Sequence, residues 1–392
     1  MISQRVDIQN LVKEMTQWRH WLHQHAETAF EEHETAAFVA KKLRLFGVEV
    51  HEGIAGTGVV GVISSESGVG SSEHGAIGLR AEMDGLHLEE KTGLPYASKN
   101  VGAMHACGHD GHMAMLLGAA KVLAERRDFA GTVYVIFQPA EENEGGAKRM
   151  IEEGILKKFP MKAIFAMHNQ AGLPVGSLGF RQGPIMAAYD VFDITITGKG
   201  CHAAHPEEGV SPFSAVGAMV EAIQSQNKSS RDLRKKVVAS VTQIQGGSTW
   251  NVIPDQVRLR GTCRTFDKKV QDKLELALKK EAKRIGKKYS VNVSAAYTRR
   301  YPATINSARE TTFAAEVGEA VVGAKKVIVP VDPSMGAEDF AFFLQKVPGS
   351  YLRIGAGKSA SLHSSSYDFN DKLLPVGVAY WVELVKRYFG NE

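Results

Sequence analysis

Apolar runs of strand length alternate with amphipathic stretches of helical length along much of this chain. In the first half, the predicted elements are helices at 8–22 and 33–46, strands at 58–63 and 76–80, helix 113–125, strand 132–138, helix 145–153 and strand 163–167. This alternation indicates an α/β layer on a largely parallel sheet. A Ser/Gly-rich stretch at 64–75 is predicted to be a flexible loop.

The middle of the chain has a different pattern. Its predicted elements are strand 191–197, helix 211–226, strands 237–244 and 257–265, a basic amphipathic helix at 267–287 and strand 291–297. This order matches the ferredoxin-like split βαβ unit. Alternation then resumes with helix 308–321, strand 326–329, helix 337–344, strand 351–354 and helix 375–388. We therefore expect a discontinuous α/β domain of residues 1–185 and 300–392, with an inserted α+β domain at 186–299.

The composition argues against several classes of protein. Hydrophobic residues make up 44% and charged residues 23% of the 392 positions, as in ordinary globular enzymes. The net charge of +4 is not concentrated in a tail, which argues against nucleic acid or a membrane as a partner. No apolar run reaches the roughly 18 residues that cross a bilayer, and the N-terminus lacks the form of a signal peptide. Three scattered cysteines fit a reducing compartment, so we expect a cytoplasmic protein.

Three predicted strands of the α/β domain end in acidic residues or a histidine. Strand 76–80 leads into Glu82 and Asp84, strand 132–138 into Glu141 and Glu142, and strand 163–167 into His168. The carboxyl ends of strands form the ligand crevice in open α/β sheets. We therefore expect these carboxylates and this imidazole to lie at one edge of the sheet.

The stretch from Met104 to His112 contains three histidines, one cysteine and one aspartate. Thiolate, imidazole and carboxylate are the side chains that bind divalent transition metals. Only Gly108 separates Cys107 from His109, so a tight turn could direct both at one ion. The alternative is a histidine-rich helix start with a buried, inert cysteine.

Further candidate ligands are Glu141 or Glu142, His168, and His363 in a late loop. Five ligands exceed the needs of one tetrahedral zinc, whereas two ions roughly 3.5–4 Å apart would use them all. Cys107 could bridge such a pair as a thiolate.

The adjacent glutamates, Glu141 and Glu142, are suited to two different roles. One carboxylate can bind metal while its neighbour acts as a general base. The alternative is a solvated acidic turn, because Glu144 and a pair of glycines follow.

Other histidines and cysteines are assigned supporting roles. His23 and His25 form an H-x-H pattern that we interpret as surface and packing residues at a helix end. Flanking histidines are expected to support ligands rather than to coordinate metal; these are His105, His112 and His205. Cys201 and Cys263 are expected to be small packing residues.

Nine sequence blocks together resemble the di-metal aminoacylase/carboxypeptidase superfamily, peptidase family M20. They resemble in particular its amidohydrolase branch of hippurate hydrolases, N-acyl-amino-acid deacylases and auxin-conjugate hydrolases. The blocks run in family order over nearly the whole chain; they are 79–84, 107–112, 138–142, 167–169, 200–206, 246–247 with 251–255, 261–266, 335–340 and 362–363.

The resemblance implies five metal ligands: Cys107, His109, Glu142, His168 and His363. It implies that Glu141 is the general base and that Asp84 has a supporting catalytic position. It also implies two divalent ions per chain, Zn²⁺ or Mn²⁺, with Ni²⁺ and Co²⁺ as further candidates. The chain departs from the family at Glu82, where aspartate is usual, and at Gly85 and His87, which puts substrate preference in question rather than the reaction class.

The inserted domain of the family is a lid that dimerises in many relatives. His202, Asn251 and Arg264 match lid positions that bind substrate, His202 at the carbonyl or carboxylate and sometimes across a dimer. Arg264 has the planar fork that suits a carboxylate, although an ordinary strand-surface arginine is the alternative. A homodimer or homotetramer through the lid is therefore expected.

The predicted activity is hydrolysis of the amide bond of small-molecule N-acyl-L-amino acids, such as hippurate or N-acetyl-amino acids. A dipeptidase or carboxypeptidase of the same fold is the nearest alternative. A non-catalytic regulatory protein would usually have lost Glu141 or a ligand. A structural zinc protein would have closed four-ligand coordination without a free carboxylate base.

Overall fold

The protein is described by a computed structural model that covers residues 2–65, 75–142 and 144–390. The chain folds into two compact units. The larger unit contains Met1–Ile185, Ile305–Asp332 and Asp339–Glu392, and the smaller contains Met186–Thr304 and Pro333–Glu338. The segment 333–338, which the sequence pattern assigns to the α/β domain, belongs to the smaller unit because Ser334 pairs with Met186 and accepts a hydrogen bond from Ala187.

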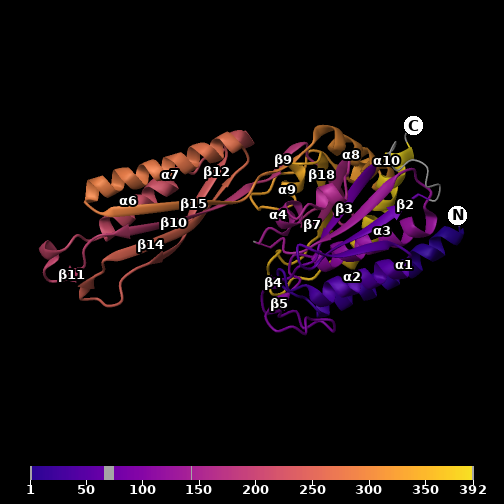
Figure 1. Cartoon of the computed structure of the whole chain (residues 1–392), viewed down its shortest axis with the longest axis horizontal. Coiled ribbons are helices and arrows are strands. Elements are labelled where there is room, and N and C mark those ends of the chain that lie inside the picture. The colour runs from indigo at the N-terminus through magenta and orange to yellow at the C-terminus, as the bar shows by residue number, and fades with distance from the viewer. Residues whose placement is uncertain (1, 66–74, 143, 391–392) are drawn as a thin grey trace. The chain divides into compact units, whose positions relative to one another are not determined.

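The larger unit is built on an eight-stranded sheet (Figure 1). Its strands, in spatial order, are β1 (Glu49–Ile54), β2 (Gly58–Ser64), β6 (Thr132–Gln138), β3 (Ala76–Glu82), β7 (Ala163–Ala171), β18 (Gly349–Gly357), β8 (Leu178–Gly179) and β17 (Val327–Ile328). The four central strands, β6, β3, β7 and β18, run parallel. The β1–β2, β2–β6 and β18–β8 pairs are antiparallel. The predicted parallel character therefore holds at the centre of the sheet, where the candidate site residues originate.

The helices of the larger unit are α1 (Ile2–Gln24), α2 (His33–Leu45), α3 (His109–Arg126), α4 (Gly146–Glu152), α5 (Ile155–Lys158), α8 (Ala308–Val322), α9 (Ala341–Leu344) and α10 (Leu374–Gly390). Helix α3 is almost entirely buried, because it packs against α1, α2, α10 and the sheet. Glycines allow α3 to approach α1 and α10 closely. A Cβ on Gly118 of α3 would lie 2.3 Å from Met15 Sδ of α1, and a Cβ on Gly377 of α10 would lie 2.0 Å from Met115 Sδ of α3. The helix that begins beside the candidate ligands is therefore closely packed from His109 to Ala120.

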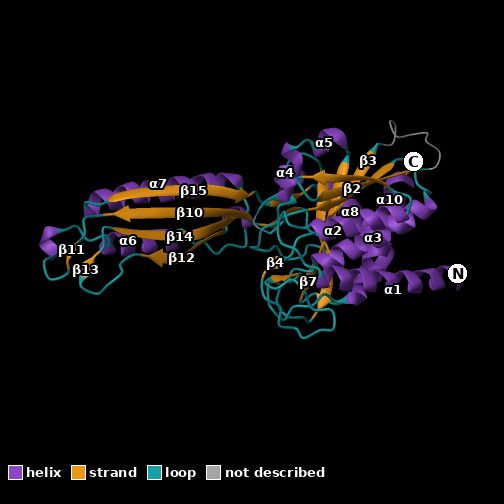
Figure 2. Cartoon of the chain, turned by 60° about the horizontal axis from the view of Figure 1, so that its bottom comes forward, coloured by secondary structure: helices purple, strands orange, loops and turns teal. Residues whose placement is uncertain are grey.

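The smaller unit is an antiparallel sheet with two helices on one face. The strands lie in the order β12 (Val237–Gln245), β14 (Gln256–Thr265), β10 (Ala188–Thr197) and β15 (Asn292–Tyr301), and the helices are α6 (Phe213–Gln224) and α7 (Lys268–Tyr289). Leu274, Leu278, Ala282 and Ile285 recur at helical spacing on α7 and join the core of this unit. A small ribbon of β11 (Cys201–His202) and β13 (Val252–Ile253) lies at one end of the sheet (Figure 2).

The remaining elements are short. Strand β9 (Gly183–Met186) pairs with β16 (Thr304–Asn306), and β4 (Leu86–His87) pairs with β5 (Ala103–Met104). Single 3₁₀ turns occur at Pro206–Glu208, Leu233–Lys235, Ala324–Lys326 and Asp371–Leu373. No helix that the structure describes combines the length and apolar character needed to span a bilayer.

Several predicted boundaries were wrong in ways that matter for the site. Helix α3 begins at His109 rather than at residue 113, and β7 runs through His168 to Ala171. The helix predicted at 337–344 is confined to α9, because the buried Asp339 carboxylate is tied to Arg80 and Gln138 and holds the preceding backbone out of a helix. Most of the loop predicted at 64–75 lies outside the described residues.

Candidate metal centre

The carboxyl ends of the central parallel strands bring several sequence-predicted residues to one edge of the sheet. Glu82 is the last residue of β3, and Asp84 follows two residues later. The pair Glu141 and Glu142 follows β6, and His168 lies in the last part of β7. His363 follows β18, and its backbone N–H donates a hydrogen bond to the carbonyl oxygen of Ala106 at 2.8 Å. That bond brings the late loop to the segment that carries Cys107.

Gly108 allows Cys107 and His109 to share this edge. Its φ of +92° lies in the left-handed region, which L-residues rarely adopt. A Cβ at this position would lie 2.3 Å from Asn169 Oδ1 and 2.8 Å from Tyr367 Oη. Glycine is therefore required here both by the backbone conformation and by the lack of space.

Backbone carbonyls select the tautomer of two histidines. His109 Nδ1 lies 2.8 Å from the carbonyl oxygen of Asp84, and His168 Nδ1 lies 2.8 Å from that of Asn169. A carbonyl oxygen only accepts, so in the neutral ring each Nδ1 carries the hydrogen and each Nε2 presents a lone pair. This is the arrangement that orients metal-binding histidines.

The free donor atoms converge in two overlapping groups. Cys107, His109 and His168 form one group and Cys107, Glu142 and His363 the other, with the donor atoms in each lying within 4.8 Å of one another. Cys107 Sγ is 3.4 Å from His168 Nε2, and His363 Nε2 is 3.1 Å from Glu142 Oε1. A sulfur and a nitrogen, or a nitrogen and an oxygen, that bind the same tetrahedral zinc lie roughly 3.4–3.6 Å apart. The spacing therefore fits donors that share an ion.

Two buried donor atoms in these groups have no hydrogen-bond partner within the described part of the chain. They are His109 Nε2 and Glu142 Oε1, although the second lies within ion-pair distance of His363 Nε2. A buried polar atom without a partner is costly in a folded protein. Because both atoms face a cluster of thiol, imidazole and carboxylate groups, the residues present fit divalent metal ions.

The electrostatics of the cluster also favour a cation. Burial, followed by the charges of Glu142 and Glu141, raises the pKa of the Cys107 thiol well above its usual range. Burial alone would lower the pKa of His109, but Asp84 and Glu82 raise it to about 10. The cluster therefore has an excess of negative charge, which a divalent ion would neutralise.

The turn with the paired glutamates is fixed by side chains from elsewhere in the larger unit. Ala140 adopts a φ of +54°, and its N–H donates a hydrogen bond to Glu32 Oε1 at 2.8 Å. The N–H of Glu142 donates to Asp84 Oδ2 at 2.8 Å. Glu141 is buried, and its carboxylate lies within 4.8 Å of donor atoms of His109 and Glu142. Asp84 thus holds the glutamate turn, and its carbonyl orients His109.

Comparison with known proteins assigns the chain to a family. Residues 78–387 match the family model described as "Peptidase family M20/M25/M40". The chain belongs to this family.

Known relatives and a solved structure agree with the M20 assignment. The chain is 37% identical to an N-acetyl-L-cysteine deacetylase of Bacillus subtilis, over 98% of this chain and 90% of the relative. It is 38% identical to a hippurate hydrolase of Campylobacter jejuni, over 97% and 98% of the two chains. A Bacillus subtilis protein described as a dinuclear metal-binding peptidase from family M20 superposes with a TM-score of 0.85 at 32% identity, covering 98% and 100%.

Other polar residues of the M20 chain support this cluster without joining it. His112 places Nδ1 3.0 Å from Glu82 Oε2 and Nε2 2.7 Å from Asn169 Oδ1, so neither ring nitrogen is free for metal. His105 is buried, and burial lowers its pKa to about 4, which keeps the ring neutral.

Part of the interpretation of the H-x-H pattern was wrong. His23 is fully buried, and its Nδ1 lies 2.8 Å from a carboxylate oxygen of Asp110, the residue after His109. His25 stacks on Trp21 with ring centroids 4.0 Å apart, as a packing residue would. The buried position of His23 could not be inferred from the pattern, because its partner lies 87 residues away in the chain.

The predicted substrate residues lie at two ends of the smaller unit. His202 ends β11 and Asn251 precedes β13, so the ribbon brings these two together. Arg264 pairs with Tyr189, whose ring lies 4.1 Å from the guanidinium carbon. At the end of the sheet that carries the ribbon, Thr197 of β10 pairs with Gln256. Thr197 lies eight positions after Tyr189 on the same strand, a separation of roughly 27 Å in an extended chain. Within one chain, the smaller unit therefore does not bring Arg264 to His202 and Asn251.

The cysteines and His205 of this unit lie apart from any donor cluster in the described residues. Cys263 is buried in the core of the smaller unit and Cys201 is half-buried, as expected for packing residues. His205 is exposed, with its ring 5.8 Å from that of His202.

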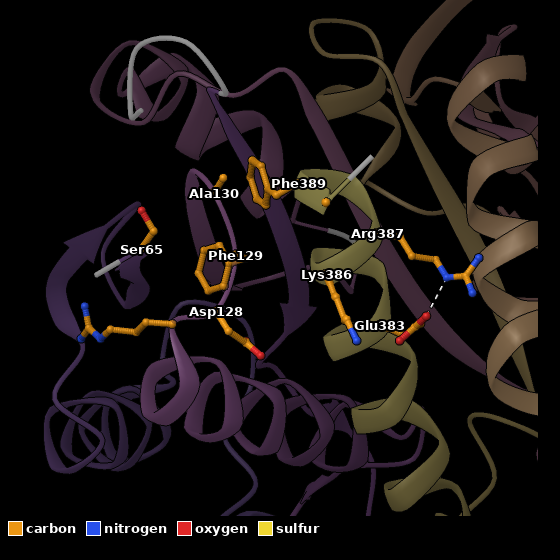
Figure 3. A pocket seen from close by; sticks show the side chains of 10 residues that line it. Ser65, Asp128, Phe129, Ala130, Glu383, Lys386, Arg387 and Phe389 are labelled. Atoms are coloured by element: carbon orange, nitrogen blue, oxygen red, sulfur yellow. Dashed lines mark hydrogen bonds and ion pairs between the residues drawn. The ribbon is translucent and has the colours of Figure 1, made fainter. Parts of the chain in front are cut away.

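An open depression of about 800 Å³ lies elsewhere on the larger unit (Figure 3). Its lining comes from Ser65 after β2, residues 127–130 ahead of β6, and the last turns of α10. Residues 127–130 precede β6, whereas Glu141 and Glu142 follow it, so the depression lies at the opposite edge of the sheet from the donor cluster. It contains none of the predicted site residues.

Proposed function

We propose that this chain is a metal-dependent amidohydrolase that converts N-acyl-L-amino acids to a carboxylic acid and a free amino acid. The observation that carries the proposal is the pair of donor groups that share Cys107 beside the buried carboxylate of Glu141. The names of the relatives, a hippurate hydrolase and a deacetylase of an N-acetyl amino acid, support this substrate class.

In this proposal, five residues hold two divalent ions: Cys107, His109, Glu142, His168 and His363. We favour Zn²⁺ or Mn²⁺, with Ni²⁺ and Co²⁺ as further candidates. Such ions lower the pKa of water toward neutrality and polarise an amide carbonyl. The thiolate of Cys107 is the proposed shared ligand, because it belongs to both groups.

Glu141 is the proposed general base. It would take a proton from the attacking water and deliver it to the leaving amine nitrogen, as a carboxylate in hydrogen-bond reach of both can do. Its position is set by the adjacent turn, in which Glu32 and Asp84 each accept a backbone hydrogen bond. This support limits movement of the carboxylate during proton transfer.

The larger unit is the proposed catalytic domain and the smaller unit the proposed lid. His202 and Asn251 would bind the substrate carbonyl, and Arg264 a substrate carboxylate. Their separation within one chain favours a homodimer or homotetramer in which His202 serves the partner's site. The edge strand β12 and the 96% exposed Trp250 offer surface for that contact.

We also propose that the enzyme acts in the cytoplasm, because its three cysteines, Cys107, Cys201 and Cys263, are free thiols. Small-molecule substrates are its proposed partners, without nucleic acid or membrane.

Assay of hippurate, N-acetyl-amino acids and dipeptides, with Mn²⁺ or Zn²⁺ added, tests the proposal. We expect hydrolysis of the N-acyl substrates, loss of activity with a chelator and recovery with a divalent ion. A preference for substrates with a free α-amine would instead identify a dipeptidase, and chelator-resistant turnover would refute the metal mechanism.

A further inference from the structure

Arg353 is a buried arginine on β18 with no carboxylate partner among the described residues. The residue is only 5% exposed, and its Nη1 donates a hydrogen bond to Tyr351 Oη at 3.3 Å. Its guanidinium carbon lies 4.9 Å from the centroid of the same tyrosine ring. Nε and Nη2 make no hydrogen bond to any residue in the described ranges, yet neither is sealed from solvent.

Two further arginines of the larger unit, buried among the residues whose burial the structure describes, are bonded differently. Arg19 donates to Asp371 at 2.8 Å and to Asp368 at 2.9 Å. Arg80 pairs with Glu82 and donates to Asp339 at 2.9 Å. A buried guanidinium normally requires such partners, because it has five N–H donors and a charge that is costly to remove from water. Arg353 therefore differs from both of these arginines.

The position of Arg353 relates it to the metal centre. In the parallel pairing of β7 and β18, Arg353 lies opposite His168, and residues paired in this way project to the same face of the sheet. Tyr351, two residues earlier on that face, has its ring centroid 6.3 Å from that of His168. On the other side, Arg353 pairs with Gly179, where an added Cβ would lie 3.0 Å from Val331 Cγ2 and 3.4 Å from Arg353 Cβ.

We propose that Arg353 binds a carboxylate of the substrate at the metal centre. This inference rests on the proposed function and adds a specificity determinant on the larger unit. Arginine presents paired N–H donors that match a carboxylate, and Nε and Nη2 remain available for one. The carboxylate has two candidate sources: a dicarboxylic acyl group such as succinyl, or the α-carboxylate of the amino acid.

Matched substrates separate the two sources. N-succinyl-L-methionine is compared with N-butanoyl-L-methionine, which has a neutral acyl group of similar length. N-acetyl-L-methionine is compared with its amide, which lacks the α-carboxylate. For each pair, the kcat/KM of the substrate with the carboxylate is divided by that of the substrate without it. This ratio is measured for wild type, Arg353→Met and Arg353→Lys. Arg126→Met, at an exposed position on α3, is the control for loss of one positive charge.

We expect Arg353→Met to lower one of the two ratios at least tenfold, mainly through KM, as loss of a charge-assisted hydrogen bond predicts. The affected ratio identifies the source of the carboxylate. Arg353→Lys should restore part of the loss, and Arg126→Met should leave both ratios unchanged. If both ratios in Arg353→Met equal those of wild type, the proposal is overturned.

Calorimetric titration with succinate provides a readout that does not depend on turnover. Wild type should bind succinate at least tenfold more tightly than Arg353→Met, with thermal unfolding and metal content of the variant checked alongside. If the chain hydrolyses none of the substrates but this difference persists, the proposed function fails while Arg353 remains an anion site. Equal succinate affinity in an intact variant would reject the anion site itself.

Discussion

Glu32 Oε1 accepts a hydrogen bond from the backbone N–H of Ala140 at 2.8 Å, although 108 residues separate the two. The other carboxylate oxygen of Glu32 accepts a hydrogen bond from Thr57 Oγ1 at 2.5 Å. Ala140 has a φ of +54°, which costs an L-residue roughly 1–2 kcal/mol. The residue that precedes α2 therefore stabilises the strained backbone next to Glu141.

Glu32 should make the stability of the protein fall as the pH rises. Burial, followed by the charge of Asp84, raises its pKa from 4.5 to about 7. Between these values the folded protein keeps a proton that the unfolded chain releases. The stabilisation that Glu32 gives to the folded state is therefore complete below about pH 4.5 and is lost as the pH rises through about 7. The total loss in the free energy of unfolding is at most about 3 kcal/mol.

The measurement is denaturant unfolding of wild type and Glu32→Gln in chelator at pH 5 and pH 8. Glutamine keeps the oxygen that accepts from Ala140 but does not titrate. Relative to Glu32→Gln, wild type should be less stable at pH 8 than at pH 5 by up to about 3 kcal/mol. A difference between the two proteins that does not change with pH would contradict the prediction.

Glu141→Gln should remove a proton acceptor while leaving the metal ligands intact. We expect kcat to fall roughly 10²–10⁴-fold, the usual contribution of a general base. Metal content, measured by elemental analysis, should stay near that of wild type. Turnover at the wild-type rate would show that another group accepts the proton.

Cys107 belongs to both donor groups, whereas His168 and His363 each belong to one. Cys107→Ala should therefore lower the metal content per chain more than His168→Ala or His363→Ala does. Elemental analysis after dialysis against a fixed metal concentration checks this order. Equal losses from all three variants would argue against a shared thiolate.

Gly108→Ala should disrupt the centre through a steric conflict. Its Cβ would lie 2.3 Å from Asn169 Oδ1, in addition to the strain of a positive φ. Gly102→Ala is a matched control, because Gly102 has a φ of +79° with no heavy atom within 4 Å of the added Cβ. We expect Gly108→Ala to lose about 1–3 kcal/mol more stability than the control and to bind less metal. The prediction fails if the two alanine variants unfold alike.

The alternation of strands and helices allowed the fold class and the convergence of strand ends to be predicted from the sequence. Glu82, Asp84, Glu141 and His168 could be placed at one edge because parallel strands carry their carboxyl ends to the same side. Boundaries were less accurate at residues 109 and 337–340. There, Gly108 starts α3 early, and the bonds of Asp339 prevent a longer α9.

Glu32, His23 and Arg353 could not be recognised as site residues from the sequence. The partners of Glu32 and His23 lie 108 and 87 residues away, and Arg353 resembles any arginine on a strand. No local pattern indicates which buried arginine will lack a carboxylate, because that depends on which strands become neighbours.

The sequence by itself determined which donor atoms the chain can offer and, through the alternation of strands and helices, the edge of the sheet to which most of them are carried. Only the tertiary structure decided which nitrogen of His109 and of His168 is free, because the carbonyls of Asp84 and Asn169 accept the Nδ1 hydrogens. It also decided that Glu32 supports the glutamate turn and that Arg353 lies beside His168 without a carboxylate among the described residues. Hydrogen bonds and burial depend on distance in space, and that distance is set by the packing of segments far apart in the sequence.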